Sequence, residues 1–473
     1  MTGVGLIIVF IILIIVMIIM MSKFNVHAFL AMLLISLVLG IIAGIPLFDV
    51  RGADGAVKIG MTNVIQTGFA NTLRSIGLVI ILGALIGMVL EATGAAFKIA
   101  DTVIKVVGQK RPVLGIMLMG WIVSLPVFCD SGFVILNPVR RALVKKTRVS
   151  SVSTSVALGL GLYASHVFIP PTPGPIAAAG TLFQQGLGVE PNLLLVMGMG
   201  ALASIPCLIG AYFWSIYVGK KVKSAEDTNL EAIKQTYEEI VASYGKLPSA
   251  WLSYAPIITP ILLIGLGSIA NMNKWTGTSH MVANFFGTPW VALSCGVLFG
   301  ILQMIVTGKL DKFQTLCNDC LKVVGPIIFI TATSGVLGNT IANTDIVPFI
   351  RENAVQLSTV GILFPFILSA ILKTAQGSST VALITASAIV APMLGTLGLA
   401  TPVGAALCVM SIAAGSMTVS HANDSYYWVV TNFGEMTPQN GYRAHTMGTL
   451  IEGLCGIVGV FILKIIFVNI LGL

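Results

Sequence analysis

Charged residues are scarce in this chain. Only 9% of its 473 residues are Asp, Glu, Lys or Arg, whereas 56% are hydrophobic. A water-soluble protein of this length needs a far larger charged surface, so this composition excludes a soluble fold. Apolar stretches such as 3–21, 27–47 and 191–218 reach the roughly 20 residues that a transmembrane helix needs. We therefore predict an all-α, polytopic membrane protein.

Sequence motifs of hydrolytic enzymes and of metal sites are also missing. The chain contains no H-E-x-x-H and no G-x-S-x-G, which argues against an intramembrane enzyme. Its cysteines are scattered, and Cys317 and Cys320, the C-x-x-C pair, have no second pair or nearby His to complete a metal site. We expect no cofactor and no metal. An intramembrane enzyme that uses Asp130 and Asp424 with the histidines stays a remote alternative.

The sequence lacks the marks of a cleaved signal as well. The run 3–21 has no basic start and no A-x-A cleavage site, so we interpret it as a retained first helix. The net charge of +8 is concentrated in short loops such as 140–148 and 220–223. This distribution is typical of cytoplasmic loops and gives no indication of nucleic-acid binding. We expect both termini to lie outside and residues 219–250 to form a cytoplasmic linker.

Two apolar segments contain polar residues that a simple membrane helix does not tolerate. Residues 112–145 have basic residues at both ends, so they cannot be one crossing. We predict a re-entrant hairpin with its tip at "CDSG" (129–132), facing protein or water because irregular backbone is not tolerated in lipid. The small and polar middle of "LKTAQGSSTVALITAS" (372–387) predicts a second hairpin.

Two further membrane helices are predicted to be interrupted. Residues 152–182 contain "HVFIPPTPGP" (166–175), whose four prolines remove helix hydrogen bonds and force an unwound stretch. Residues 401–430 contain "SHANDSYYW" (420–428), in which small and polar side chains replace apolar ones. The polar runs at apparent membrane depth all fall in these two helices and the two hairpins. We expect the four segments to meet in one central site.

The same order of elements occurs twice along the chain: span, span, hairpin, interrupted span, span. We predict a first transmembrane repeat over 1–218, which also holds the N-terminal helix, and a second repeat over 251–473. The first hairpin is predicted to enter from the cytoplasm and the second from outside, so the repeats should have inverted topology. Inverted repeats with broken helices are the architecture of many secondary transporters. A further span within 343–375 would overturn the inversion.

At these segments the sequence resembles the gluconate permease family, within the wider group of anion-transporting ion transporters. The matching pieces are "VFCDSGFVIL", "HVFIPPTPGPIAAAG", "QGSSTVALIT" and "SHANDSYYW". The resemblance implies proton symport of small hydroxylated carboxylates, typically gluconate and other sugar acids, and relatives carry D-serine. Two positions depart from the family pattern. Thr172 replaces a His, and Tyr426 and Tyr427 precede Trp428 where Gly and one aromatic are usual.

Asp130 and Asp424 are the candidate proton-coupling residues. A carboxylate at bilayer depth is costly and is usually functional, and burial favours its protonated form. The alternative for each residue is a structural role, because Asp also caps the start of a helix. Neither motif contains a Lys or Arg that would keep the carboxylate ionised.

Small polar residues in the four segments are the candidate substrate ligands. Half-helix N-termini offer free N–H groups and partial positive charge to a substrate carboxylate. Short hydroxyl, amide and imidazole side chains suit its hydroxyl groups, and Lys373 is a weaker candidate. The predicted substrate-binding residues are Ser131, Gly132, His166, Thr172, Gln376, Gly377, Ser378, Ser379, Thr380, His421, Asn423 and Ser425.

We therefore predict a secondary active transporter that imports a small hydroxylated monocarboxylate with protons. A Na⁺-coupled carboxylate permease and a permease for D-serine or another hydroxy amino acid are the alternatives. The expected partners are the carboxylate, H⁺ and the lipid bilayer, and a homodimer is the alternative to a monomer. The expected location is the bacterial inner membrane.

Overall fold

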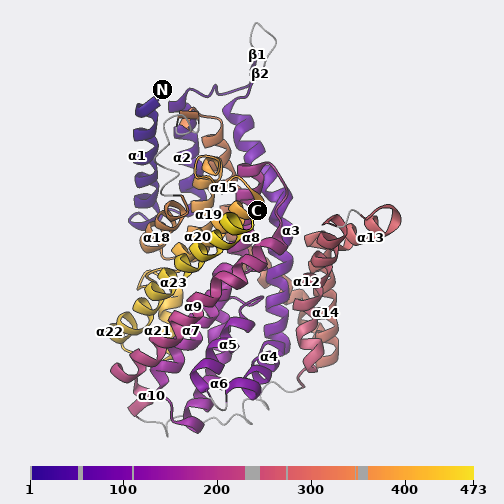
Figure 1. The fold of residues 1–473 in the computed structure, drawn as a ribbon, viewed down its shortest axis with the longest axis vertical. Coiled ribbons are helices and arrows are strands. Elements are labelled where there is room, and N and C mark those ends of the chain that lie inside the picture. Colours follow the sequence, from indigo (N-terminus) through magenta and orange to yellow (C-terminus); the bar gives the residue numbers. More distant parts are fainter. Residues whose placement is uncertain are drawn as a thin grey trace.

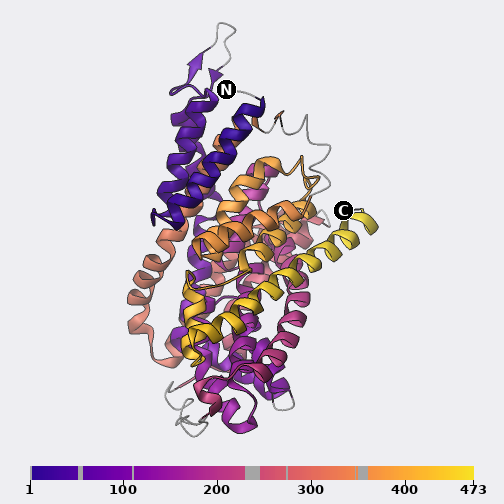
Figure 2. The same cartoon turned by 90° about the vertical axis from the view of Figure 1, so that its left-hand side faces the viewer.

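The protein is a bundle of helices. The computed structural model describes residues 3–51, 57–108, 111–228, 246–272, 275–346, 348–349 and 361–472. In these ranges the only strands are β1 (Val50–Arg51) and β2 (Val57–Lys58), an antiparallel pair. This pair projects beyond the helices in Figures 1 and 2. The all-α prediction is confirmed.

The first half of the chain runs from α1 to α10. Its helices are α1 (Gly3–Ser22), α2 (Ala28–Ala43), α3 (Met61–Thr93), α4 (Ala95–Val103), η1 (Ile104–Gly108), α5 (Pro112–Val123), α6 (Cys129–Thr147), α7 (Ser151–Phe168), α8 (Pro173–Thr181), η2 (Leu182–Leu187), α9 (Leu193–Lys221) and α10 (Ala225–Thr228). Helix α7 ends just before Pro170 and Pro171, which lack the N–H groups that a helix needs, and α8 begins at Pro173.

The second half runs from α12 to η7. Its helices are α12 (Ala250–Met272), α13 (Gly277–Gly287), α14 (Pro289–Thr307), η4 (Leu310–Lys312), α15 (Phe313–Ala342), α18 (Leu363–Gln376), α19 (Ser379–Val390), η5 (Ala391–Met393), α20 (Pro402–Met417), α21 (Ser425–Phe433), α22 (Pro438–Gly441), η6 (Tyr442–Thr446), α23 (Met447–Lys464) and η7 (Ile465–Ile470). Figure 1 shows α12, α13 and α14 as an outlying group, with α12 and α14 packed against α3.

Eight helical stretches of the described chain are long and apolar enough to cross a membrane. They are Gly3–Met21, Met61–Thr93, Ser151–Leu187, Leu193–Lys221, Ala250–Asn271, Pro289–Thr307, Leu310–Ala342 and Pro438–Ile470. The multi-span prediction is therefore confirmed. The predicted span 27–47 is a shorter apolar helix, α2.

Corresponding elements of the two halves pack in the same way. Helices α5 and α6 form a hairpin against α7, as α18 and α19 do against α20. Helix α9 packs on α7 as α23 packs on α20. The halves interlock, because α8 contacts α19, α21 contacts α6, and α3 lies along α15. The division into two repeats and the opposite membrane orientations of the halves stay predictions.

The interrupted helices lie at the centre of the bundle. Every residue of α7 is buried, and every residue of α20 after Pro402 is buried. Helix α1, by contrast, leaves most of its apolar side chains at least partly exposed, as a lipid-facing helix does. The first limbs of both interrupted helices therefore lie inside the molecule.

The tip of the first hairpin differs slightly from the prediction. The turn is formed by residues 124–128, and 129–132 are the first turn of α6. Pro126 lies in this turn, and the Ser124 hydroxyl donates to the carbonyl of Val127 at 2.9 Å. The second hairpin turns at Gly377, whose φ of +85° is the left-handed conformation that glycine adopts readily. The "CDSG" sequence therefore begins a helix and does not form the turn itself.

Part of the predicted linker docks on the first half. The Arg140 guanidinium donates to the Glu226 carboxylate at 2.8 Å, and both side chains are buried. Asp227 accepts from the backbone N–H of Ser151, where α7 begins. Arg141 pairs with Glu435 beyond α21, so this cluster also reaches the second half. Residues 229–245 lie outside the described residues.

The possible extra span at 343–375 is only partly described. Helix α15 ends at Ala342 and α18 begins at Leu363. Residues 347 and 350–360, including Arg351, lie outside the described residues. The described part of this region shows the first limb of the second hairpin.

Close contact between α5 and α7 depends on glycine. A Cβ on Gly161 would lie 2.1 Å from the Met117 carbonyl oxygen, whereas a Cβ on Gly198 of α9 would meet nothing within 4 Å. We expect Gly161→Ala to lower the stability of the detergent-solubilised protein by about 1–3 kcal/mol through overpacking. Gly198→Ala should leave stability unchanged or raise it, because Ala favours a helix. Thermal unfolding of both variants checks this, and equal melting temperatures would contradict the packing.

Candidate functional site

A buried ion pair joins the second hairpin to the second interrupted helix. The Lys373 ammonium on α18 lies 2.5 Å from the Asp424 carboxylate, and the two side chains are 1% and 6% exposed. Asp424 also caps α21 by accepting from the N–H of Tyr426 at 3.1 Å, and the Ser420 hydroxyl donates to it at 2.5 Å. Asp424 therefore has both a capping role and a fixed cation.

Lys373 holds more than the carboxylate. Its ammonium also donates to the carbonyl of Gly377, and it lies 5.7 Å from the centre of the Tyr163 ring of α7. Gly377 approaches the break in the second helix so closely that a Cβ there would lie 2.1 Å from the Asn423 carbonyl oxygen. The ion pair thus holds the tip of the second hairpin against the break. Gly377 permits this close approach because it has no side chain.

Asp130 lies next to this pair and has no cation of its own. It is in the first turn of α6, and the Ser425 hydroxyl at the start of α21 donates to it at 3.3 Å. The thiol of Cys129 is 3.7 Å from its other oxygen. No Lys or Arg of the described chain forms an ion pair with Asp130, which is half-buried. Asp130 and Asp424 are thus neighbours across Ser425 with different electrostatic surroundings.

A cavity of about 430 Å³ opens beside Asp130. It lies between the end of α3, the first hairpin and α15, with Glu91, Ser131 and Leu316 among its lining residues. The Ser131 hydroxyl is within hydrogen-bonding reach of the Glu91 carboxyl. The sequence analysis missed Glu91, although it is the only carboxylate in the predicted span 74–93 and that isolation was a usable signal.

His421 and Asn423 both turn toward the second hairpin. An imidazole nitrogen of His421 is 3.0 Å from the carbonyl oxygen of Thr374, and the Asn423 amide donates to the same oxygen at 2.9 Å. Ser378 caps α19, because its hydroxyl accepts from the N–H of Val381 at 3.3 Å. His421 and Asn423 therefore hold the hairpin and the break together in the present conformation, whereas Ser378 serves only its own hairpin.

Residues of the first interrupted helix take different roles. The Thr172 hydroxyl lies 2.8 Å from each of two carbonyl oxygens, those of His166 and Ile169. Its hydrogen bonding therefore stabilises the backbone of the break in which it lies. The His166 ring lies 6.0 Å from the Phe128 ring, and its Nδ1 has no hydrogen-bond partner in the described chain. Gly132 is a packing position, since a Cβ there would lie 2.6 Å from the Leu162 side chain.

The remaining predicted residues lie along the second hairpin. The Gln376 amide nitrogen is buried without a partner in the described residues. Ser379 is buried, and Thr380 approaches Gly174 of α8. Both hairpins and both interrupted helices are therefore linked through contacts between predicted site residues or their immediate neighbours.

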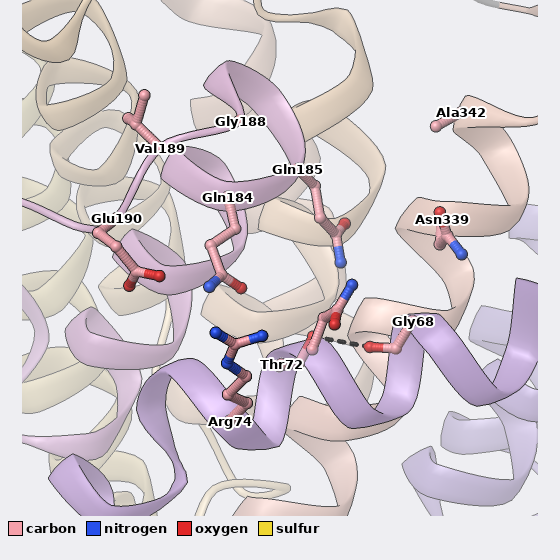
Figure 3. Close-up of a pocket in the computed structure, with 11 residues that line it drawn as sticks. Gly68, Thr72, Arg74, Gln184, Gln185, Gly188, Val189, Glu190, Asn339 and Ala342 are labelled. Atoms are coloured by element: carbon pink, nitrogen blue, oxygen red, sulfur yellow. Dashed lines mark hydrogen bonds between the residues drawn. The ribbon is translucent and has the colours of Figure 1, made fainter.

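A second polar cavity, of about 490 Å³, lies between α3, η2 and α15. Figure 3 shows Arg74 pointing toward Gln184, with Glu190 nearby and Thr72 and Asn339 on the other side. Arg74 forms no ion pair with any described residue. The sequence analysis did not single out Arg74, although an Arg inside an apolar run is itself a signal.

Comparison with known proteins places this arrangement in a family. A model of the family described as "GntP family permease" matches residues 4–466. The chain belongs to the GntP permease family. An uncharacterized permease of Haemophilus influenzae is 34% identical to this permease, over 94% of this chain and 89% of its own. The high-affinity gluconate transporter of Escherichia coli is 28% identical, over 94% and 96%, and the L-idonate transporter of the Gnt-II system is 27% identical, over 93% and 95%.

The fold is also shared with a solved transporter structure. MtrF of Neisseria gonorrhoeae, described as an antimetabolite efflux pump, superposes with a TM-score of 0.64. The sequences are 14% identical, and the match covers 94% of this permease and 96% of MtrF. The family and the membrane spans together make the protein a multi-pass inner membrane permease and not an enzyme.

The Lys373–Asp424 pair generates a prediction on stability. Removing one partner leaves a buried charge without compensation, so Lys373→Met and Asp424→Asn should each destabilise the protein by about 3–5 kcal/mol. The double variant removes both charges and should recover a large part of that loss. Thermal unfolding in detergent checks the cycle, and a double variant as unstable as the sum of the single variants would contradict a direct pair.

Proposed function

We propose that this permease imports a small hydroxylated monocarboxylate, a gluconate-like sugar acid, by proton symport. Full-length similarity to gluconate and L-idonate transporters supports the substrate class, since both substrates are polyhydroxylated monocarboxylates. The observation that carries the proton coupling is that Asp130 has no cation partner among the described residues, while its neighbour Asp424 has one. Asp130 is the proton site in this proposal, and Asp424 stays ionised.

Electrostatics couples the proton to the substrate at this site. A substrate carboxylate near Asp130 repels the ionised side chain and so favours its protonation. Protonation in turn removes the repulsion and favours binding of the anion, because linkage between two ligands is reciprocal. The N-terminal turns of α6 and α19 supply N–H groups for the substrate carboxylate, and Ser131 and Gln376 suit its hydroxyls. The proton and the anion then cross the membrane together without adding net charge to the site.

Alternating access follows from the proposed repeats. The segments 1–218 and 251–473 are the two inverted repeats, joined by the cytoplasmic linker 219–250. Each repeat contributes one hairpin and one broken helix to the centre, so a movement of one repeat against the other changes which side reaches Asp130. The cavity at Glu91 and Asp130 lies at the predicted cytoplasmic end of α3 and corresponds to the inner access route.

The cavity at Arg74 is the proposed outer access route. It lies on the predicted outer side, where η2 continues from α8. Helices η2 and α8 connect Gln184 in this cavity to Thr172 at the first break. The two residues are separated by roughly 18 Å at the usual helical rise. An unpaired guanidinium in a half-open polar cavity attracts carboxylates and raises their local concentration.

Asp130→Asn should lower the accumulation ratio of gluconate in proteoliposomes about tenfold for each pH unit of an imposed gradient, because one transported proton is lost. Counterflow of labelled gluconate should persist, because exchange at equal pH needs no net proton movement. Asp319→Asn, which removes an exposed carboxylate paired with Lys322 away from the site, is the matched control. Accumulation by Asp130→Asn at the wild-type level would exclude Asp130 as the proton site. Accumulation driven by a Na⁺ gradient, or counterflow with D-serine and not with gluconate, would replace the proposal with one of its alternatives.

Arg74→Gln should raise the KM for gluconate uptake about tenfold at low ionic strength, in the range of electrostatic steering effects. The maximal rate should change little, because Arg74 is distant from Asp130, and Arg74→Lys should restore part of the affinity. Arg51→Gln changes an exposed Arg on β1, outside the cavity, and is the control. An unchanged KM for Arg74→Gln would remove this cavity from the substrate path.

A further inference from the structure

Glu452 is a carboxyl group with no described partner in the interior of the bundle. It lies on α23, its side chain is 0% exposed, and neither of its oxygens has a hydrogen-bond partner in the described chain. No Lys or Arg of the described residues pairs with it. An ionised carboxylate in such surroundings would carry a large desolvation cost without compensation. These surroundings therefore favour the neutral form of the Glu452 side chain over the ionised form.

The groups around Glu452 do not stabilise a negative charge. The titratable groups within electrostatic reach are Cys207 on α9, Tyr426 on α21 and Cys455 on α23 itself. At the next residues along α23, α20 presents Ala414 and Thr418, and α7 presents Phe168. On the preceding η6 segment, His445 is also fully buried with both ring nitrogens unpartnered in the described residues. A proton can leave Glu452 only if this region rearranges and admits water.

The same face of α23 holds the break in the second interrupted helix. The Thr446 hydroxyl donates to the carbonyl of Ser420 at 2.6 Å, and the Thr449 hydroxyl accepts from the Ser420 N–H at 3.0 Å. Thr449 precedes Glu452 by three residues, on the same side of α23, and Thr446 lies three residues before that, at the end of η6. A Cβ on Gly453 would lie 2.2 Å from the Thr418 side chain, so α23 and the break are in direct contact.

This contact connects Glu452 to the central ion pair. Ser420, held by Thr446 and Thr449, donates its hydroxyl to Asp424, which pairs with Lys373. A shift of α23 away from the break would therefore change the surroundings of Asp424 and of the second hairpin. Loss of the Glu452 proton requires such a shift, because the carboxylate has to gain solvent or a donor.

We propose that Glu452 is a second proton-binding site, separate from Asp130, whose proton is released when α23 and the α20–α21 break move apart during the transport cycle. The proposal rests on proton symport as the function of this permease. It assigns one proton to Asp130 and one to Glu452 for each monocarboxylate carried. In this proposal the proton exchanges with the central site by way of His445, whose ring lies 5.5 Å from the Tyr426 ring.

The stoichiometry of transport tests this assignment. Glu452→Gln keeps the size and hydrogen-bonding capacity of the side chain but cannot release a proton. In proteoliposomes clamped at zero membrane potential, its equilibrium accumulation ratio for gluconate should be about tenfold lower than the wild-type ratio for each pH unit of gradient, because one proton fewer is worth one pH unit. Counterflow of gluconate should continue. Glu452→Asp keeps an ionisable group and should keep the wild-type ratio.

The outcomes separate this proposal from the proposed function. If the wild-type protein does not accumulate gluconate under a pH gradient, proton symport itself is wrong. If the wild-type protein does so and Glu452→Gln reaches the same ratio, Glu452 is not a transported-proton site. A folding defect in Glu452→Gln is detected by its elution profile in detergent. Infrared difference spectra of the wild-type protein and Glu452→Asp then provide the test, and the absence of a carboxyl band that responds to substrate would overturn the proposal.

Discussion

The arrangement of the centre depends on the ion pair between Lys373 and Asp424. Each charge by itself would be too costly in the interior, and together they fix the second hairpin against the second broken helix. The Gly377 carbonyl accepts a hydrogen bond from Lys373, and the Ser420 hydroxyl donates one to Asp424. Charged side chains therefore hold the unwound backbone of the hairpin tip and of the break, where regular helix hydrogen bonds are missing. Asp130 differs from its neighbour Asp424 in this respect, because no Lys or Arg of the described residues pairs with it.

The sequence predicted the fold through residues that a membrane helix cannot tolerate. Prolines 170, 171, 173 and 175, together with the small polar runs at 376–380 and 420–425, mark the breaks where the structure has them. The basic loops predicted that 112–145 doubles back, and α5 and α6 form that hairpin. These features are local, since the loss of helix hydrogen bonds or the presence of charge acts within a few residues.

The details of the site needed three-dimensional contacts. The partner of Asp424 lies 51 residues earlier in the chain, in another motif, and no spacing rule connects them. The sequence analysis therefore found no cation for Asp424, and it weighed the two aspartates equally. Thr172 was predicted as a ligand from its position, but its hydroxyl is engaged by the backbone of the same break. Glu91 and Glu452 could have been found, because each is the only acidic residue within a long apolar run.

The Arg140–Glu226 contact has a consequence for how the molecule moves. Arg140 belongs to the first hairpin and Glu226 to the connection between the halves, and Arg141 reaches Glu435 next to the second broken helix. Ion pairs thus join the first hairpin, the connection between the halves and the second broken helix at one end of the bundle. Helices that are joined at one end move least at that end, so a small rotation near these ion pairs gives a larger displacement at the opposite end of the bundle. In the proposed transport cycle, the strength of the Arg140–Glu226 ion pair would limit how far the two halves move relative to each other at this end.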